Sequence, residues 1–259
     1  MPVHPTAIID PGARIDSTAE IGPYCVIGDE VEIGARTRLM ASVFVEGATT
    51  IGEDNTFYPY STVGVASQDK KYHGERAFTR IGDGNSIREF VTIHRGTEGG
   101  GLTTSIGDGN LLMAYVHVAH DCHIGACNIL ANAVTLAGHV TIADNANIGA
   151  FSGVHQFCRV GRESFVGGYS VVTQDVMPFS SVVSDREIRV FGANRIGLER
   201  RSFSRDSIES LQTALRILTR GGLNTTQAVE KIRAEVPPCA ELDELLVFIA
   251  SSPRGVIKG

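Results

Sequence analysis

The nine residues HVAHDCHIG, residues 117–125, contain three histidines, an aspartate and a cysteine. Imidazole, carboxylate and thiol groups at this density suit a metal centre or a catalytic base with a supporting carboxylate. They also suit a polar surface that has no chemistry. The direction of each side chain decides among these three kinds of site, and that direction depends on the secondary structure that carries the segment.

An aliphatic or aromatic residue recurs at every sixth position through most of the chain. The first run extends from Ile9 to Val63, the period returns at Ile81, and a run one residue out of phase extends from Ile106 to Val172. This period is neither that of an alternating strand nor that of a helix. It predicts an all-β solenoid in which each hexapeptide forms a short strand and a corner, and three hexapeptides close one coil of a triangular prism.

The residue two positions before each repeated aliphatic is usually small or β-branched, so both side chains are expected to point into the prism. Cys25, Cys122 and Cys158 occupy this small inward position. A free cysteine commonly behaves as a small apolar side chain. The prediction for these three thiols is therefore core packing.

Two segments interrupt the coils, at residues 64–80 and 95–105. The first lacks the inward aliphatics and has Asp69 and Glu75 in their places, whereas the second contains four glycines. Loops that project from a rigid scaffold often carry binding residues. Both segments are therefore predicted to be loops beside a functional site.

The hexapeptide pattern fades after Val172, and segments with helical spacing and polar starts follow from about Asn194. Pairs of glycines and prolines divide these segments, as expected between short helices. The chain is therefore predicted to form the solenoid over residues 1–190 and a C-terminal α-helical domain over residues 191–259.

The geometry of a three-sided coil separates the histidines of the first motif. Residues eighteen apart stack at the strand spacing of about 4.8 Å, whereas residues six apart lie on different sides. His117 and His123 therefore point from different sides and cannot share a metal ion within one chain. His120 and Asp121 are expected at a corner between those sides.

The corner that carries His120 continues into the following coils. Gly138 and His139 stand one coil further along, and the next coil places His155 and Gln156 at or beside the same corner. A purely structural solenoid has no need of such a column. The column therefore favours a functional site.

The residue types in this column suit acyl transfer. His120 can act as a general base that takes a proton from a hydroxyl as it attacks a thioester, and Asp121 can orient the imidazole and stabilise its charged form. Gly138 can bring a bare backbone N–H close to the developing oxyanion. The sequence contains no Gly-x-Ser-x-Gly motif, which favours direct attack over a covalent serine intermediate.

The repeat resembles the left-handed parallel β-helix of the hexapeptide acyltransferases. More specific motifs are TIHRGT, NLLMAYVHVAHDC, ILANAVTLAGHV, VHQFC and GLERRSFSRD, in this order and followed by a helical tail. At these motifs the chain resembles, over essentially its whole length, the UDP-N-acetylglucosamine O-acyltransferases that catalyse the first step of lipid A biosynthesis. The resemblance supplies the left hand of the helix, which the repeat alone does not determine.

The resemblance also implies an activity and partners. The family transfers an R-3-hydroxyacyl chain from acyl carrier protein, which bears it on phosphopantetheine, to the 3-hydroxyl of UDP-N-acetylglucosamine. It works as a cytoplasmic homotrimer with active sites between subunits, without a further cofactor or a metal. The sequence leaves open the preferred acyl length and whether the acceptor carries a 3-hydroxyl or a 3-amino group.

Roles for individual residues follow from the same resemblance. The general base falls on His120, its supporting aspartate on Asp121 and the oxyanion donor on Gly138. The positions that match substrate-binding residues of the family are Asp69, Lys71, His94, His117, His139, His155, Gln156, Asn194, Arg200 and Arg201.

Two further positions bear on specificity. Gly168 matches the acyl-length position of the family, and a glycine there leaves the groove open, which favours a longer chain. Ile196 stands where some members have a glutamate, a departure that removes one expected nucleotide contact.

Composition agrees with these expectations. The formal net charge of −6 argues against a general nucleic-acid binder. No apolar run approaches the roughly 20 residues that span a bilayer, so the protein is not expected to cross a membrane. The start of the sequence lacks a signal-peptide pattern, and five scattered cysteines fit a reducing, cytoplasmic location.

Other functions compatible with the repeat are a coenzyme A-dependent acetyltransferase, the N-acyltransferase of the same pathway, a zinc enzyme of the β-helical carbonic anhydrase type and a scaffold without chemistry. The N-acyltransferase usually has an additional N-terminal domain, whereas the hexapeptides here begin almost at residue 7. An inter-subunit zinc site would escape the argument from separate sides. The scaffold leaves the His120 column unexplained.

Overall fold

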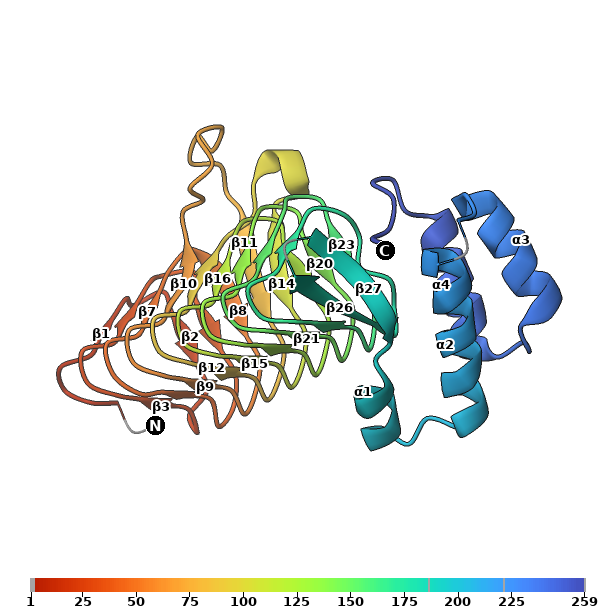
Figure 1. Cartoon of the computed structure of the whole chain (residues 1–259). Helices are drawn as coiled ribbons and strands as arrows, with labels where there is room; N and C mark the ends of the chain where they lie inside the picture. The colour runs from red at the N-terminus through yellow and green to blue at the C-terminus, as the bar shows by residue number, and fades with distance from the viewer. Residues whose placement is uncertain (1–2, 186, 221, 259) are drawn as a thin grey trace.

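Three sheets, parallel except for the last strand pair, form a long prism in the computed structural model, which describes residues 3–185, 187–220 and 222–258. From β1 to β25 consecutive strands belong to different sheets, so the chain passes once around the prism for every three strands (Figure 1). We call the nine-, eight- and ten-stranded sheets the first, second and third faces. The prism confirms the predicted all-β solenoid with a triangular coil.

The strands of each face are mostly two residues long. The first face contains β1 (Ile8–Ile9), β4 (Val26–Ile27), β7 (Phe44–Val45), β10 (Thr62–Val65), β13 (Thr92–His94), β16 (His117–Val118), β19 (Thr135–Leu136), β22 (Gly153–Val154) and β25 (Val171–Val172). The second contains β2 (Arg14–Ile15), β5 (Glu32–Ile33), β8 (Ala48–Ile51), β11 (Phe78–Ile81), β14 (Thr103–Ile106), β17 (His123–Ile124), β20 (Thr141–Ile142) and β23 (Arg159–Val160). The third contains β3 (Glu20–Ile21), β6 (Arg38–Leu39), β9 (Thr56–Phe57), β12 (Ser86–Ile87), β15 (Leu111–Leu112), β18 (Ile129–Leu130), β21 (Asn147–Ile148), β24 (Phe165–Val166), β26 (Ser180–Asp185) and β27 (Glu187–Ala193).

The core of the prism consists of the repeated aliphatic residues. From Ile21 to Val172 these side chains are at most 4% exposed, and residues of the same face stack on one another through the length of the prism. Each fully buried aliphatic side chain stabilises the fold by roughly 1.5–3 kcal/mol. Cys25, Cys122 and Cys158 are fully buried, so the prediction of core packing is confirmed for all three.

A ladder of buried asparagines occupies part of the small inward position, where the sequence pattern led us to expect small or β-branched residues. The side-chain oxygen of Asn55 accepts the backbone N–H of Asn85 at 2.9 Å, and that of Asn85 accepts the N–H of Asn110 at 2.8 Å. Asn110 and Asn128 continue the pattern. Because backbone N–H groups turn inward at this corner, between the second and third faces, a polar acceptor stabilises them better than an aliphatic side chain.

Both interruptions of the repeat leave the prism at the corner between the first and second faces. The first loop covers residues 66–77 between β10 and β11, and the second covers residues 95–102 between β13 and β14 with a 3₁₀ turn at Glu98–Gly100. They rise side by side from the prism (Figure 1). Both are shorter than the predicted spans 64–80 and 95–105, because β10 extends to Val65, β11 begins at Phe78 and β14 begins at Thr103.

A β-hairpin closes the C-terminal end of the prism, where the sequence pattern had faded. Strand β26 pairs in parallel with β24 and antiparallel with β27. In the part of the chain that the structure describes, four helices follow: α1 (Arg195–Arg200), α2 (Arg205–Arg220), α3 (Thr225–Glu235) and α4 (Ala240–Ala250). They stand beyond the last coils of the prism (Figure 1).

Ion pairs connect the helices to the last coils. The Asp175 carboxylate accepts from Arg159 Nε at 2.8 Å and from the Ser252 hydroxyl at 2.8 Å, and Arg162 pairs with Glu244 of α4 at 2.7 Å. The helices are therefore packed against the prism and not tethered loosely to it. Within the described ranges of the chain, no helix is both long and apolar enough to cross a membrane.

The contribution of the asparagine ladder to stability can be tested at the corner between the second and third faces. Replacing Asn110 by alanine removes the acceptor for the Asn128 N–H, and leaving a buried N–H unpaired costs about 1–3 kcal/mol. We expect Asn110→Ala to lower the free energy of unfolding by that amount in denaturant titrations at one protein concentration. The exposed Asn132 supplies the control, because Asn132→Ala should change it by less than about 0.5 kcal/mol. Equal effects of the two substitutions would contradict a stabilising ladder.

Candidate active site

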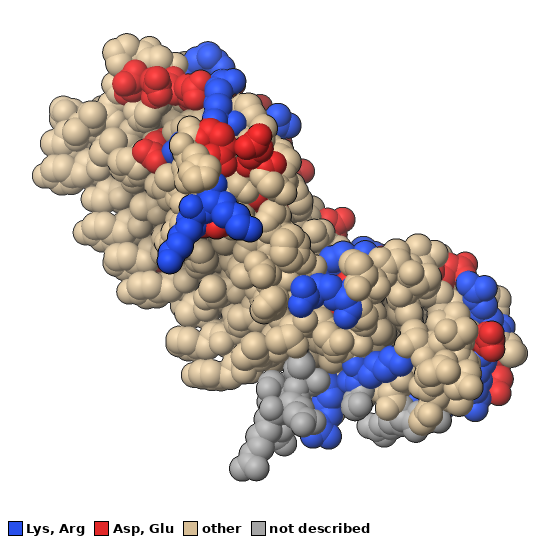
Figure 2. Space-filling view, turned by 90° about the horizontal axis from the view of Figure 1, so that it is seen from above, with Lys and Arg blue, Asp and Glu red and all other residues tan. Residues whose placement is uncertain are grey.

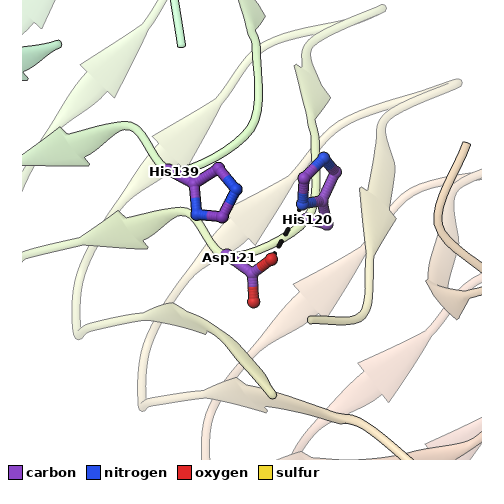
Figure 3. Close-up of side chains that lie close together, drawn as sticks. All are labelled: His120, Asp121 and His139. Carbon is purple, nitrogen blue, oxygen red and sulfur yellow. Dashed lines mark hydrogen bonds and ion pairs between the residues drawn. The ribbon is translucent and has the colours of Figure 1, made fainter. Parts of the chain in front are cut away.

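His120 and Asp121 lie at the corner between β16 and β17 and contact each other directly (Figure 3). His120 Nδ1 donates a hydrogen bond to Asp121 Oδ2 at 2.8 Å. The neutral ring therefore carries its proton on Nδ1, and Nε2 has a free lone pair. Nε2 lies 3.8 Å from the Asp69 carboxylate of the first loop. The pair has the arrangement of a general base with its orienting carboxylate.

The corner conformation brings Asp121 under the second loop. Asp121 has a φ of 58°, a left-handed conformation that turns the chain from the first face to the second. Its carboxylate is fully buried and accepts the Thr97 N–H at 2.9 Å and the Thr97 hydroxyl at 2.6 Å. The Asp121 N–H donates to the Thr104 hydroxyl at 2.8 Å. Every hydrogen-bonding group of Asp121 that faces the loop is thus engaged.

The sequence analysis did not identify Thr97. Its only signal was its place in the motif TIHRGT and in the second predicted loop. A threonine in a glycine-rich loop is ordinary, so the residue type by itself carried no information.

Gly138 lies directly against the His120 ring. A Cβ atom at Gly138 would lie 2.5 Å from His120 Cε1, which is too close for any side chain without displacing the imidazole. Within the described chain, the Gly138 N–H has no hydrogen-bond partner. The absence of a side chain at Gly138 therefore leaves room for the His120 ring. The unpaired Gly138 N–H is available to hydrogen-bond a ligand beside that ring.

His139 continues the column one coil away. Its ring meets the His120 ring edge to face at 5.0 Å (Figure 3). It also stacks on Phe157 at 4.5 Å. Burial lowers the pKa of His139. Phe157 thus occupies the next position of the stack, one coil further along. His155 and Gln156 are exposed beside it, and His155 Nδ1 donates to the Gln156 carbonyl at 3.1 Å.

His94 and His117 lie on the first face beside this corner. Their rings meet edge to face at 5.1 Å, and the Thr92 hydroxyl lies 2.7 Å from His117 Nδ1. Burial lowers the pKa of His94 to about 4, and it also lowers the pKa of His117. Both imidazoles are therefore neutral at neutral pH and offer hydrogen bonds without charge.

Asp69 and Lys71 lie in the first loop. Asp69 Oδ1 accepts the Lys71 N–H at 3.0 Å, and this hydrogen bond holds the pKa of the Asp69 carboxyl below its usual value, with a smaller contribution from His120. Lys71 is exposed. The loop thus presents a carboxylate and an ammonium group beside the His120 corner.

His120, Asp121 and His139 have ligand atoms within 4.8 Å of one another, so among the described residues this cluster is the candidate for a metal. Both Asp121 oxygens, however, point at hydrogen-bond donors from Thr97 and His120, and His120 Nδ1 points at Asp121. This arrangement suits proton transfer better than coordination of a common ion. His117 and His123 belong to the first and second faces, as predicted.

The other predicted residues lie on different sides of the prism. Asn194 and Arg200 line a hollow of about 340 Å³ on the third face, together with Asn147, Phe165 and Ser181. Gly168 is exposed at the corner between the third and first faces. One chain therefore brings together the His120 corner and the first loop, but it does not bring Asn194, Arg200 or Gly168 to them.

Arg201 and Asn194 are tied to the protein itself. Arg201 Nε lies 2.8 Å from the carboxylate of Glu163, which is 3% exposed, and the guanidinium also contacts Asn145. Asn194 caps α1 by accepting the Gly197 N–H and donates to the Glu163 carbonyl at 2.9 Å. Arg195 and Arg200 both line the hollow; Arg195 pairs with Glu199 at 3.2 Å, whereas Arg200 forms no ion pair among the described residues.

A prism of hexapeptide coils that carries a histidine–aspartate pair on one corner has the architecture of the hexapeptide-repeat transferases. The family model for bacterial transferase hexapeptides matches residues 103–138, and the model for domain 2 of UDP-N-acetylglucosamine O-acyltransferase matches residues 175–257. The acyl-[acyl-carrier-protein]–UDP-N-acetylglucosamine O-acyltransferase of Thermodesulfovibrio yellowstonii is 47% identical over 99% of both chains. The chain therefore belongs to the UDP-N-acetylglucosamine O-acyltransferase family.

Solved structures agree with this assignment. The UDP-N-acetylglucosamine O-acyltransferase of Moraxella catarrhalis superimposes with a TM-score of 0.95, at 42% identity over 100% of both chains. The enzyme from Bacteroides fragilis 9343 also gives 0.95, at 40% identity over 99% of this chain and 100% of that one. These matches confirm the left-handed parallel β-helix with C-terminal helices.

Gly138 provides a steric test of the site. In Gly138→Ala the new methyl group displaces the His120 ring, and we expect kcat to fall by about 10²-fold or more with little change in thermal unfolding. The matched control is Gly153→Ala, where a Cβ meets nothing within 4 Å and activity should be retained. Full activity of Gly138→Ala would show that the ring position does not matter to the reaction.

Proposed function

We propose that this protein transfers an R-3-hydroxyacyl chain from acyl carrier protein to the 3-hydroxyl of UDP-N-acetylglucosamine, the first step of lipid A biosynthesis. The observation that carries the proposal is the His120 ring, whose Nε2 is free and whose Nδ1 donates to the buried Asp121. The relatives are named as O-acyltransferases that use acyl carrier protein and this nucleotide sugar. Their names favour the hydroxyl acceptor over an amine.

The proposed reaction is direct. His120 Nε2 takes the proton of the 3-hydroxyl as its oxygen attacks the thioester carbonyl, and the carbon–oxygen bond forms. The oxyanion of the tetrahedral intermediate is stabilised by the N–H of Gly138, which lies against the His120 ring. As the carbon–sulfur bond breaks, His120 returns the proton to the phosphopantetheine thiolate of the carrier protein. Asp121 stabilises the imidazolium between these two proton transfers.

Substrate contacts follow from the groups around the corner. Asp69 and Lys71 of the first loop, with His139, His155 and Gln156 along the column, are proposed to bind the sugar and the pantetheine arm. Neutral His94 and His117 supply uncharged hydrogen-bonding groups on the adjoining face. For the nucleotide we propose Arg200 as the phosphate contact, with Asn194 and Arg201 shaping the hollow, since Glu163 already holds Arg201.

A homotrimer with shared sites would reconcile these positions. The hollow with Arg200 and the acyl-length position Gly168 lie away from the His120 corner in one chain, so a site that uses all three combines neighbouring copies. Stacked, exposed aromatic residues also run along the corner between the third and first faces, namely Tyr60, Phe90 and Tyr115, and then Phe151 and Tyr169. Such apolar surface favours contact with another chain. Charged groups leave wide uncharged areas on the prism (Figure 2).

The remaining parts of the proposal concern the location of the enzyme in the cell, its prosthetic group, its preferred acyl length and the roles of its two domains. We infer a cytoplasmic enzyme, in keeping with five free cysteines, whose only prosthetic group is the phosphopantetheine carried by its donor. Gly168 is proposed to leave room for a longer acyl chain. We also propose that residues 1–190 and 191–259 act as separate domains, the prism carrying the chemistry and the helices helping to bind the nucleotide.

The first experiment measures transfer from R-3-hydroxyacyl carrier proteins of several chain lengths to UDP-N-acetylglucosamine. We expect robust transfer by the native protein and a loss of about 10²–10⁴-fold in folded His120→Ala. Transfer retained by the variant would remove His120 from the role of base. Native activity only with acetyl-coenzyme A, or zinc in stoichiometric amount in the purified protein, would support the alternative enzymes instead.

Sharing of sites between copies is tested by mixing two inactive chains. His120→Ala and Arg200→Ala, unfolded and refolded together, should recover activity, because some sites then combine an intact His120 corner with an intact Arg200 from the neighbour. The control mixture of His120→Ala with Asp121→Ala should recover none, since both residues belong to one corner of one chain. Failure of the first mixture, with mixed assemblies verified by mass spectrometry, would place both groups of one site in the same chain.

A further inference from the structure

Thr97 makes two hydrogen bonds to the carboxylate that supports His120. Its N–H donates to Asp121 Oδ1 at 2.9 Å, and its hydroxyl donates to Asp121 Oδ2 at 2.6 Å. Oδ2 is also the oxygen that accepts His120 Nδ1–H at 2.8 Å. The threonine hydroxyl and the imidazole thus converge on one oxygen atom in a place where Thr97 is 7% exposed.

These bonds restrict the orientation of the carboxylate. A carboxyl group turns easily about its terminal torsion, and a turn would carry Oδ2 out of line with the imidazole N–H. With Oδ1 bound to a backbone N–H and Oδ2 bound to a hydroxyl, such a turn breaks two hydrogen bonds at once. Thr97 therefore determines where the acceptor for His120 lies.

The second loop packs against Asp121 closely enough to make this contact specific. A Cβ atom at Gly100 would collide with the Asp121 side chain, so the glycine permits the loop to close over the carboxylate. Thr97 also accepts, through its carbonyl, the N–H groups of Gly100 and Leu102 at 3.1 and 2.9 Å. The loop is thus folded around the residue that touches Asp121.

Glu75 connects this loop to the first one. Its carboxylate accepts the His73 N–H at 2.9 Å within the first loop and the Glu98 N–H at 3.1 Å, one residue from Thr97. Hydrogen bonds from backbone N–H groups lower the pKa of Glu75. The first loop, which carries Asp69 and Lys71, is therefore hydrogen-bonded through Glu75 to the second loop, which carries Thr97.

We propose that Thr97 is a positioning residue for acyl transfer: it holds Asp121 in line with His120, and the second loop is part of the catalytic assembly. The inference rests on the proposed role of His120 as general base. It assigns to Thr97 no contact with substrate, so its loss should affect the chemical step more than substrate binding.

The test compares Thr97→Val, which keeps the shape and removes the hydroxyl, with Thr97→Ser, which keeps the hydroxyl. We expect kcat of Thr97→Val to fall by about tenfold or more, with KM for UDP-N-acetylglucosamine changed by less than about twofold. The acid limb of the kcat/KM profile should move to lower pH, because an Asp121 carboxylate that has turned out of line with the imidazole stabilises imidazolium less. Asp69 and His139, which also face His120, are unchanged in these variants.

Thr97→Ser should restore both kcat and the pH profile, and Thr103→Val, a half-buried threonine at the start of β14, should leave both as in the native protein. Native kcat and pH profile in Thr97→Val, or no recovery in Thr97→Ser with native thermal stability, would overturn the inference. His120→Ala is assayed in parallel: if it keeps activity, the base proposal fails, whereas an inactive His120→Ala beside an unaffected Thr97→Val removes only the role of Thr97.

Discussion

Hydrogen bonding between successive coils is the interaction on which the site depends. The His117 N–H donates to the Val134 carbonyl at 2.9 Å, and the His139 N–H donates to the His120 carbonyl at 3.1 Å. These bonds set one strand spacing between coils, and the stacked aliphatic core keeps the coils in register. Gly138 and His139 therefore meet the His120 ring although eighteen or nineteen residues separate them from it. The column of His120, Gly138 and His139 is a direct result of the way in which the prism is built.

Charge is distributed unevenly around this column. Burial keeps His94, His117 and His139 uncharged by lowering the pKa of each imidazole. The groups that face His120 with charge are the carboxylates of Asp121 and Asp69. In the proposed reaction, the positive charge that develops on His120 lies beside two carboxylates and uncharged rings.

The three corners of the prism carry different chemistry on the same repeat. The corner between the first and second faces carries the His120 column and both loops, whereas the next corner contains the buried asparagine ladder. The last corner carries stacked, exposed aromatic rings. Because the repeat specifies only the two inward residues of each hexapeptide, the corner residues vary without loss of the core. One face or corner can therefore serve catalysis while another serves stability or association.

The sequence by itself determined the prism, since inward residues at a period of six leave no other regular fold. It also placed His120 and Asp121 on one corner with Gly138 and His139, because the stacking interval follows from the period. It did not reveal Thr97, the contact of Glu75 with the second loop or the Glu163 pair that holds Arg201. These contacts join residues 24, 23 and 38 positions apart, through loops or across the junction with the helices, where no repeat sets the register. Only the tertiary structure decided them, since loop paths depend on hydrogen bonds and close contacts such as that of Gly100 with Asp121.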